Sequence, residues 1–226
     1  MKTLNYFKLS MWATLLGCII MFASCDLDSK QDVKTKAKIS KAIEKRDFNA
    51  ARELCSKLNY YRDKELKEID MAEINYVLDQ NGVSDAYYLA NELNAKNEFF
   101  DVASRNIMRL LQGGQGTQLI YVLAGWTFEY TFDPEPKMSS ESPRHNDYYN
   151  KEANKFNSLL DAIVNFSILN EDNGLIKKAI KLYRPTAVEK NRTKTNRYAQ
   201  YMYTYKLVDD SKNAAIAKAK ENGIEL

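Results

Sequence analysis

Apolar residues recur at spacings of three and four along most of this chain, which is the repeat of an amphipathic helix. In residues 49–58, NAARELCSKL, the apolar positions are Ala50, Ala51, Leu54, Cys55 and Leu58. These positions fall on one face of a helix. The pattern therefore predicts a helix that buries this stripe, including the Cys55 thiol, against the rest of the protein.

The same pattern predicts helices on both sides of this one, beginning at about Val33. The helix in DMAEINYVLDQNG ends at Asn81–Gly82, a pair that is common at helix C-termini. Ser84 suits the N-cap of the helix that follows. A further helix, in FFDVASRNIMRLLQGG, stops at Gly113–Gly114.

Towards the C-terminus the helical period continues over residues 146–170. Two more helices are expected, one within 193–208 and one in SKNAAIAKAKENG, which Gly223 ends.

Two segments in the middle of the sequence do not follow this pattern. Residues 116–132, GTQLIYVLAGWTFEYTF, favour a helix by context, and a strand is the alternative because the segment is rich in strand-forming residues. Residues 133–146 hold three of the four prolines and are predicted to form a loop. This loop separates an N-terminal helical-hairpin region, 35–132, from a C-terminal helical region, 147–226.

The first 24 residues have the three parts of a secretory signal peptide. Lys2 and Lys8 are basic, residues 9–22 are mainly apolar, and the small residues Ala23 and Ser24 follow. The apolar run is shorter than the roughly 20 residues that a membrane-spanning helix needs, and its C-terminal flank is acidic. A cleaved signal is therefore favoured over a retained span.

The end of this signal, Ala23-Ser24-Cys25, resembles the lipobox of bacterial lipoproteins, although Phe22 stands where leucine is usual. The resemblance implies that the thiol of Cys25 is diacylated, that the polypeptide is cut before Cys25, and that the new N-terminus is acylated. Residues 25–34 would then form a lipidated tether. The alternative is an ordinary secretory signal with an incidental cysteine.

The lipobox resemblance implies attachment to a bacterial membrane, with the outer membrane favoured. Asp26 is similar to an inner-membrane retention signal of some bacteria, and in other lineages an acidic segment here is similar to a surface-export signal. The side of the membrane on which the protein acts stays open.

Two helical segments are similar to each other. RDFNAAREL, residues 46–54, and EFFDVASRN, residues 98–106, align Phe48 with Phe100 and Ala51 with Ala103. An aromatic residue followed three positions later by alanine resembles the helix-turn-helix unit of tetratricopeptide-type repeats. The expected fold class is therefore all-α, with antiparallel helical hairpins in a tetratricopeptide-like right-handed array.

The net charge indicates which partners to expect, and the cysteine content indicates whether a disulfide can form. Removal of residues 1–24, which carry two lysines and no acid, lowers the net charge from +3 to +1, so a nucleic-acid partner is not expected. Cys55 is then the one cysteine besides the anchor, which leaves no disulfide within the domain.

No catalytic or metal-binding pattern stands out. His145, the single histidine, lies in the proline-rich segment without triad partners, and no CxxC or HExxH spacing occurs. GGQG at 113–116 lacks the lysine of a phosphate-binding loop and is more typical of a helix-helix turn. We therefore expect a non-enzyme without a cofactor or a metal.

One tyrosine-rich stretch, YAQYMYTYK at 198–206, is the candidate binding surface. On a helix Tyr198, Tyr201 and Tyr205 share a face, whereas on a strand Tyr201, Tyr203 and Tyr205 do. Tyrosine suits recognition of peptides or glycans, and packing in the core is the alternative.

These features predict a membrane-anchored, non-catalytic scaffold of the cell envelope that binds a protein or a peptide. The alternative is a ligand- or glycan-binding lipoprotein associated with a transporter.

Overall fold

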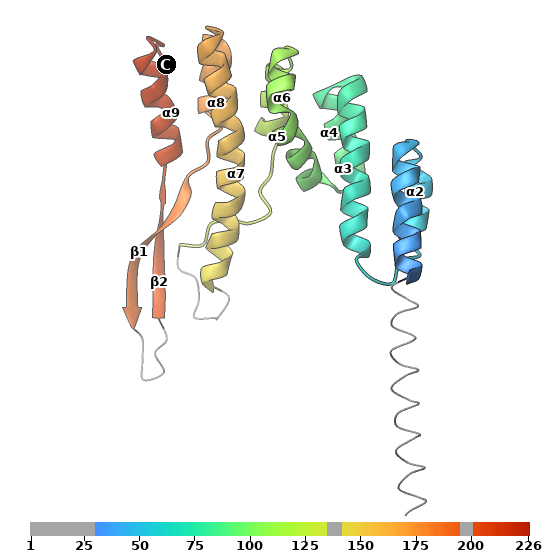
Figure 1. Cartoon of the computed structure of the whole chain (residues 1–226). Coiled ribbons are helices and arrows are strands. Elements are labelled where there is room, and N and C mark those ends of the chain that lie inside the picture. The colour runs from blue at the N-terminus through green and yellow to red at the C-terminus, as the bar shows by residue number, and fades with distance from the viewer. Residues whose placement is uncertain (1–29, 135–141, 195–200) are drawn as a thin grey trace, which may run out of the picture. The chain divides into compact units, whose positions relative to one another are not determined.

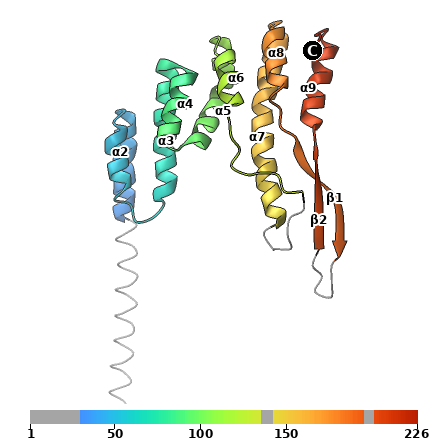
Figure 2. The same ribbon diagram turned by 180° about the vertical axis from the view of Figure 1, so that it is seen from behind.

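The computed structural model describes residues 30–134, 142–194 and 201–226, and this part of the protein is mainly helical (Figure 1 and, from behind, Figure 2). The helices are 30–44, α2 (Phe48–Cys55), α3 (Arg62–Asn81), α4 (Val83–Glu92), α5 (Lys96–Gln112), α6 (Gly116–Ala124), α7 (Ser142–Leu169), α8 (Asn173–Ile180) and α9 (Asp210–Glu221). Two strands, β1 (Thr186–Lys194) and β2 (Tyr201–Val208), add a hairpin to the expected all-α architecture. Within the described ranges, no helix has the length and apolar composition needed to cross a membrane.

The protein divides into two compact units. Unit 1 comprises the described residues up to Gln80 together with Leu89–Phe99, and unit 2 comprises Asn81–Tyr88 together with Phe100–Leu226.

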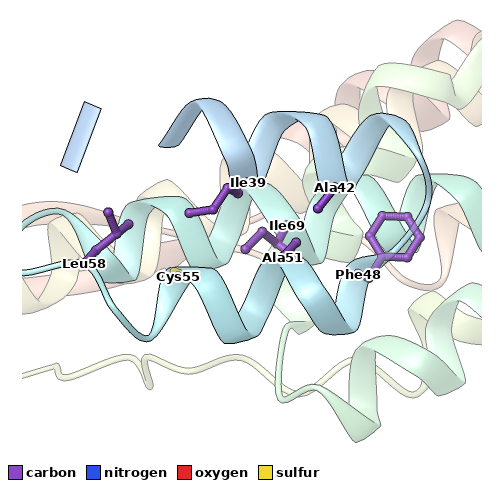
Figure 3. Packing of buried hydrophobic residues seen from close by; sticks show 7 residues of the cluster. All are labelled: Ile39, Ala42, Phe48, Ala51, Cys55, Leu58 and Ile69. Carbon is purple, nitrogen blue, oxygen red and sulfur yellow. The ribbon is translucent and has the colours of Figure 1, made fainter. Parts of the chain in front are cut away.

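The core of unit 1 lies between the helix 30–44, α2 and α3 (Figure 3). Its buried side chains are Ile39, Ala42, Phe48, Ala51, Cys55, Leu58 and Ile69. The apolar stripe expected in residues 49–58 is confirmed, since three of these residues belong to it and its other two members pack against the core from the side. Burial also raises the pKa of the Cys55 thiol.

Five of the described helices end in the same kind of turn. A residue in the left-handed region, with φ between 54° and 74°, follows the helix, and the next N–H donates to the carbonyl five residues back at 2.8–3.1 Å. The left-handed residues are Arg46, Asn94, Gly114, Glu171 and Gly223. The residues that accept these bonds are all buried: Ala42, Ala90, Leu110, Ser167 and Ala219.

These turns do not support the alignment of Phe48 with Phe100. Phe48 lies two residues after the left-handed Arg46, whereas Phe100 lies six residues after Asn94. The two aromatic residues therefore occupy different positions relative to the turns before their helices.

The long helix α7 organises unit 2 through three asparagines. Each side-chain amide both accepts from the backbone N–H and donates to the backbone carbonyl of a single residue in an extended segment. The pairs are Asn146 with Asp133 (3.1 and 2.8 Å), Asn150 with Ala187 (2.6 and 2.8 Å) and Asn157 with Arg184 (2.9 and 2.8 Å). This asparagine row holds the segment before α7 and the start of β1 against the helix.

The helix expected within residues 193–208 is wrong, because this region contributes to a β-hairpin. β1 pairs antiparallel with β2, from Thr186 opposite Val208 to Lys194 opposite Tyr201, with a bulge between Glu189 and Asn191. The sequence YMYTYKLV of β2 is rich in aromatic and β-branched residues, which favour strands.

Two other expectations are confirmed only in part. The helix expected over 116–132 ends at Ala124, and the residues after it, up to 132, form neither a helix nor a strand. The loop expected over 133–146 is shorter, since α7 begins at Ser142. His145 consequently lies on a helix.

Candidate functional site

The tyrosine-rich stretch 198–206 does not form the helical face that was one of the two predicted arrangements. Tyr198 lies outside the described residues, and Tyr201 occupies a strand position opposite Lys194. Tyr205 packs against Tyr149, Ala153 and Ala187, and burial raises the pKa of its hydroxyl. For Tyr205, the core alternative therefore describes the side chain better than an open binding surface.

A different set of tyrosines lines an open hollow in unit 2, here called the tyrosine hollow. Its lining residues are Ser84, Tyr87, Tyr88, Tyr121, Val122, Ala124 and Gly125, and its volume is about 360 Å³. The side chain of Tyr88 is 67% exposed and that of Tyr121 is 79% exposed. These are large exposures for aromatic side chains, which normally bury most of their surface.

Helix geometry explains why these residues meet. Ser84, Tyr87 and Tyr88 are spaced i, i+3 and i+4 on α4, so they share one face. The opposite face carries the buried residues Val83 and Ala86. An apolar contact therefore fixes α4 and leaves its tyrosine face open.

The same spacing recurs on α6, where Tyr121, Ala124 and Gly125 lie on one face at its C-terminal end. One hydrogen bond ties the starts of the two helices together, since the N–H of Val83 donates to Oε1 of Gln115 at 2.9 Å. Gln115 belongs to GGQG, which forms the turn between α5 and α6 as expected.

The chemistry of the tyrosine hollow is that of an uncharged, mainly apolar site. No lining residue carries a charge, and the polar groups are the hydroxyls of serine and tyrosine. The volume lies near the lower end of the range for small-ligand sites. The hollow therefore suits one aromatic, proline or aliphatic side chain, or a single sugar ring, better than a charged group.

A second hollow, of about 310 Å³, lies in the same unit and is lined by Ser104, Ile107, Lys155, Ser158, Leu159 and Ala162. The amine of Lys155 pairs with the carboxylate of Asp101 and lies over the ring of Phe100. Since its one charged group is already engaged, this hollow offers less to a ligand than the tyrosine hollow.

The remaining candidates from the sequence are His145, a possible metal site and Cys25. Nε2 of His145 lies 2.6 Å from the carbonyl oxygen of Thr131, so the ring acts as a donor, and its edge meets the ring of Tyr130. Over residues 30–134, 142–194 and 201–226, no three His, Cys, Asp or Glu side chains are placed to hold a metal ion. The lipidation candidate Cys25 lies outside the described residues.

Comparisons with models of known protein families, with characterised proteins and with solved structures find no match for this protein.

Proposed function

We propose that this protein is a non-catalytic scaffold of the bacterial cell envelope, anchored by lipid on Cys25, which binds a peptide segment of another protein in the tyrosine hollow. The observation that carries the proposal is the pair of largely exposed rings, Tyr88 and Tyr121, beside a hollow without charge. Exposed aromatic patches of this kind typically mark interaction surfaces, and tyrosine is enriched in them.

The proposed occupant is an uncharged apolar or aromatic side chain of an extended or helical peptide. Tyrosine rings supply rigid contact area with little loss of side-chain entropy, and their hydroxyls can bind the peptide backbone. A glycan would be expected to meet more hydrogen-bonding groups than four hydroxyls, so the glycan-binding alternative is less well supported.

The finer fold proposed is a tetratricopeptide-like array of helical hairpins. Its support is the repeated turn, with one left-handed residue and one buried acceptor, which joins the helices 30–44 and α2, α5 and α6, and α7 and α8. Arrays of such hairpins commonly present surfaces for peptides.

The test places a larger side chain at Gly125, a residue that lines the tyrosine hollow. A Cβ added at Gly125 would have Val122 O as its nearest neighbour, at 3.6 Å, and the backbone there (φ −85°, ψ 0°) is open to any residue. Gly125→Leu should therefore occupy the hollow without disturbing the fold. Gly174→Leu, at an exposed glycine of α8, is the matched control.

A photo-crosslinking amino acid at position 121 should capture a specific protein in intact cells. Capture should be lost with Gly125→Leu and kept with Gly174→Leu. Capture that persists in Gly125→Leu would refute the hollow as the site. A glycan that changes the fluorescence of Trp126, and loses that effect in Gly125→Leu, would favour the glycan-binding alternative.

A further inference from the structure

One end of unit 1 gathers the first described residues, which begin at Lys30, and the loop that joins α2 to α3, residues 56–61. Figure 1 and Figure 2 both show this loop at the end where the described residues begin. Hydrogen bonds confirm the proximity, because the buried carboxylate of Asp32 accepts from the N–H of Asn59 at 3.4 Å and from that of Tyr60 at 3.2 Å.

The loop exposes two tyrosines, Tyr60 and Tyr61, and the backbone conformation of Tyr61 is unfavourable. Tyr61 has φ +62°, in the left-handed region that bulky residues rarely adopt. The amine of Lys36 lies 4.7 Å from the centre of the Tyr61 ring and pairs with Glu65 at 2.8 Å. The loop is therefore fixed by its neighbours rather than loosely exposed.

The outward surface here is aromatic, apolar and basic. Tyr60 is 61% exposed, Tyr61 is 69% exposed, and Val33, close to the first described residue, is 66% exposed. Residues 30–34 and 56–64 contain five lysines or arginines and two acids. We call Val33, Lys34, Tyr60, Tyr61 and Arg62 the basic aromatic patch.

The short distance in sequence between Cys25 and the first described residue indicates what covers this patch. Lys30 lies only five positions after Cys25, and a segment of that length spans at most about 17 Å when fully extended. A lipidated Cys25 sits at the membrane surface, so Lys30 must lie close to the lipid headgroups. Tyrosine is enriched at that interface, and lysine and arginine are attracted to anionic lipids.

We infer that the basic aromatic patch is a membrane-contact surface, which seats unit 1 on the anionic lipid surface that holds the anchor. The inference rests on the lipid anchor of the proposed function. With the patch against lipid, unit 1 has a fixed orientation on the membrane instead of swinging on its tether.

The test uses the full-length protein purified with its native lipid and reconstituted into vesicles of phosphatidylglycerol and phosphatidylcholine. Tyr60→Trp places a reporter in the patch, and Tyr88→Trp places one at a similarly exposed tyrosine outside it. Acyl-brominated phosphatidylcholine should quench the emission of Tyr60→Trp and shift it to the blue, beyond the signal of Trp126 in the unsubstituted protein. Tyr88→Trp should show neither change.

Intact mass of the N-terminal peptide separates the two ways in which the test can fail. If Cys25 is lipidated but Tyr60→Trp is quenched no more than Tyr88→Trp, the membrane-contact surface is wrong while the anchor stands. If Cys25 carries no lipid, the anchor is wrong and the inference falls with it.

Tyr61→Gly separates a contact role from a structural one. Glycine adopts positive φ without strain, so this variant should keep the thermal stability of the protein. In the Tyr60→Trp background it should reduce the quenching by brominated lipid. Unchanged quenching with unchanged stability would also overturn the inference.

Discussion

Removing the side-chain amide of Asn157 should destabilise unit 2 far more than its size suggests. Asn157 is 2% exposed, its Oδ1 accepts from the N–H of Arg184 at 2.9 Å, and its Nδ2 donates to the carbonyl of Arg184 at 2.8 Å. Asn157→Ala leaves both backbone groups without this partner, in a place where water has little access.

A buried polar group left unpaired costs about 1–3 kcal/mol, so two such groups predict a loss of roughly 2–6 kcal/mol. The urea dependence of the unfolding free energy is about 1–3 kcal/mol/M for small proteins, so with a slope of about 2 kcal/mol/M the midpoint should fall by roughly 1–3 M. The fluorescence of Trp126 suits the measurement, because this buried residue packs edge-on against Phe100 in the same unit.

The matched control is Asn154→Ala, which removes an exposed asparagine from the same helix. Its urea midpoint should stay within roughly 0.3 M of that of the unsubstituted protein, because substitutions at exposed positions usually change stability little. Asn157→Asp keeps the acceptor but turns a carboxylate oxygen towards the Arg184 carbonyl, so its stability should recover as the pH falls and that oxygen is protonated. If Asn157→Ala shifts the midpoint no more than Asn154→Ala does, the asparagine row does not hold β1 in place.

Three further predictions concern other buried groups. The hydroxyl of Ser167 is buried and has no hydrogen-bond partner among the described residues, so Ser167→Ala should raise the unfolding free energy by about 1 kcal/mol in urea titration. Burial and a 2.5 Å hydrogen bond to Asp161 raise the pKa of Tyr183 above 10.0. The folded state then holds this proton more firmly than the unfolded state does, so stability should fall as the pH rises above 10.0, and Tyr183→Phe should lessen that fall in alkaline melts. The buried Cys55 should react with a thiol reagent only once denaturant unfolds unit 1; prompt reaction of the native protein would contradict its burial.

Much of the helical fold could be predicted from apolar spacing. The stripe of α2 and the ends of α3 at Asn81 and of α5 before Gly113 follow from residues close together in sequence, because a helix closes its hydrogen bonds within four residues. The β-hairpin could not be predicted in the same way. β2 bonds to residues of β1 that lie up to 22 positions earlier, as between Thr186 and Val208, and a helical period carries no trace of that partner.

The tyrosine hollow could not be predicted from the sequence alone. Tyr87 and Tyr88 are separated from Tyr121 by more than thirty residues. The first segment has the pattern of an ordinary amphipathic helix, and the pattern of the second, residues 116–132, suits a helix or a strand. The hydrogen bond from Val83 to Gln115 brings the two helix starts together, and only a contact of this kind shows that their tyrosines line one hollow. The sequence predicted a binding surface around Tyr201 because several tyrosines lie close together in that stretch.

The turns that end the helices recur along the described chain, and the alignment of Phe48 with Phe100 does not follow them. The backbone requirement is a left-handed residue, which glycine meets most easily, yet Arg46, Asn94 and Glu171 fill three of the five positions. What the five turns share is a buried residue four positions earlier, whose carbonyl accepts the closing hydrogen bond. That position is alanine in three turns and leucine or serine in the others, which is too common a set to identify from composition. The recurring turn is therefore encoded where burial and a positive φ coincide, and an alignment of aromatic residues such as Phe48 and Phe100 does not detect it.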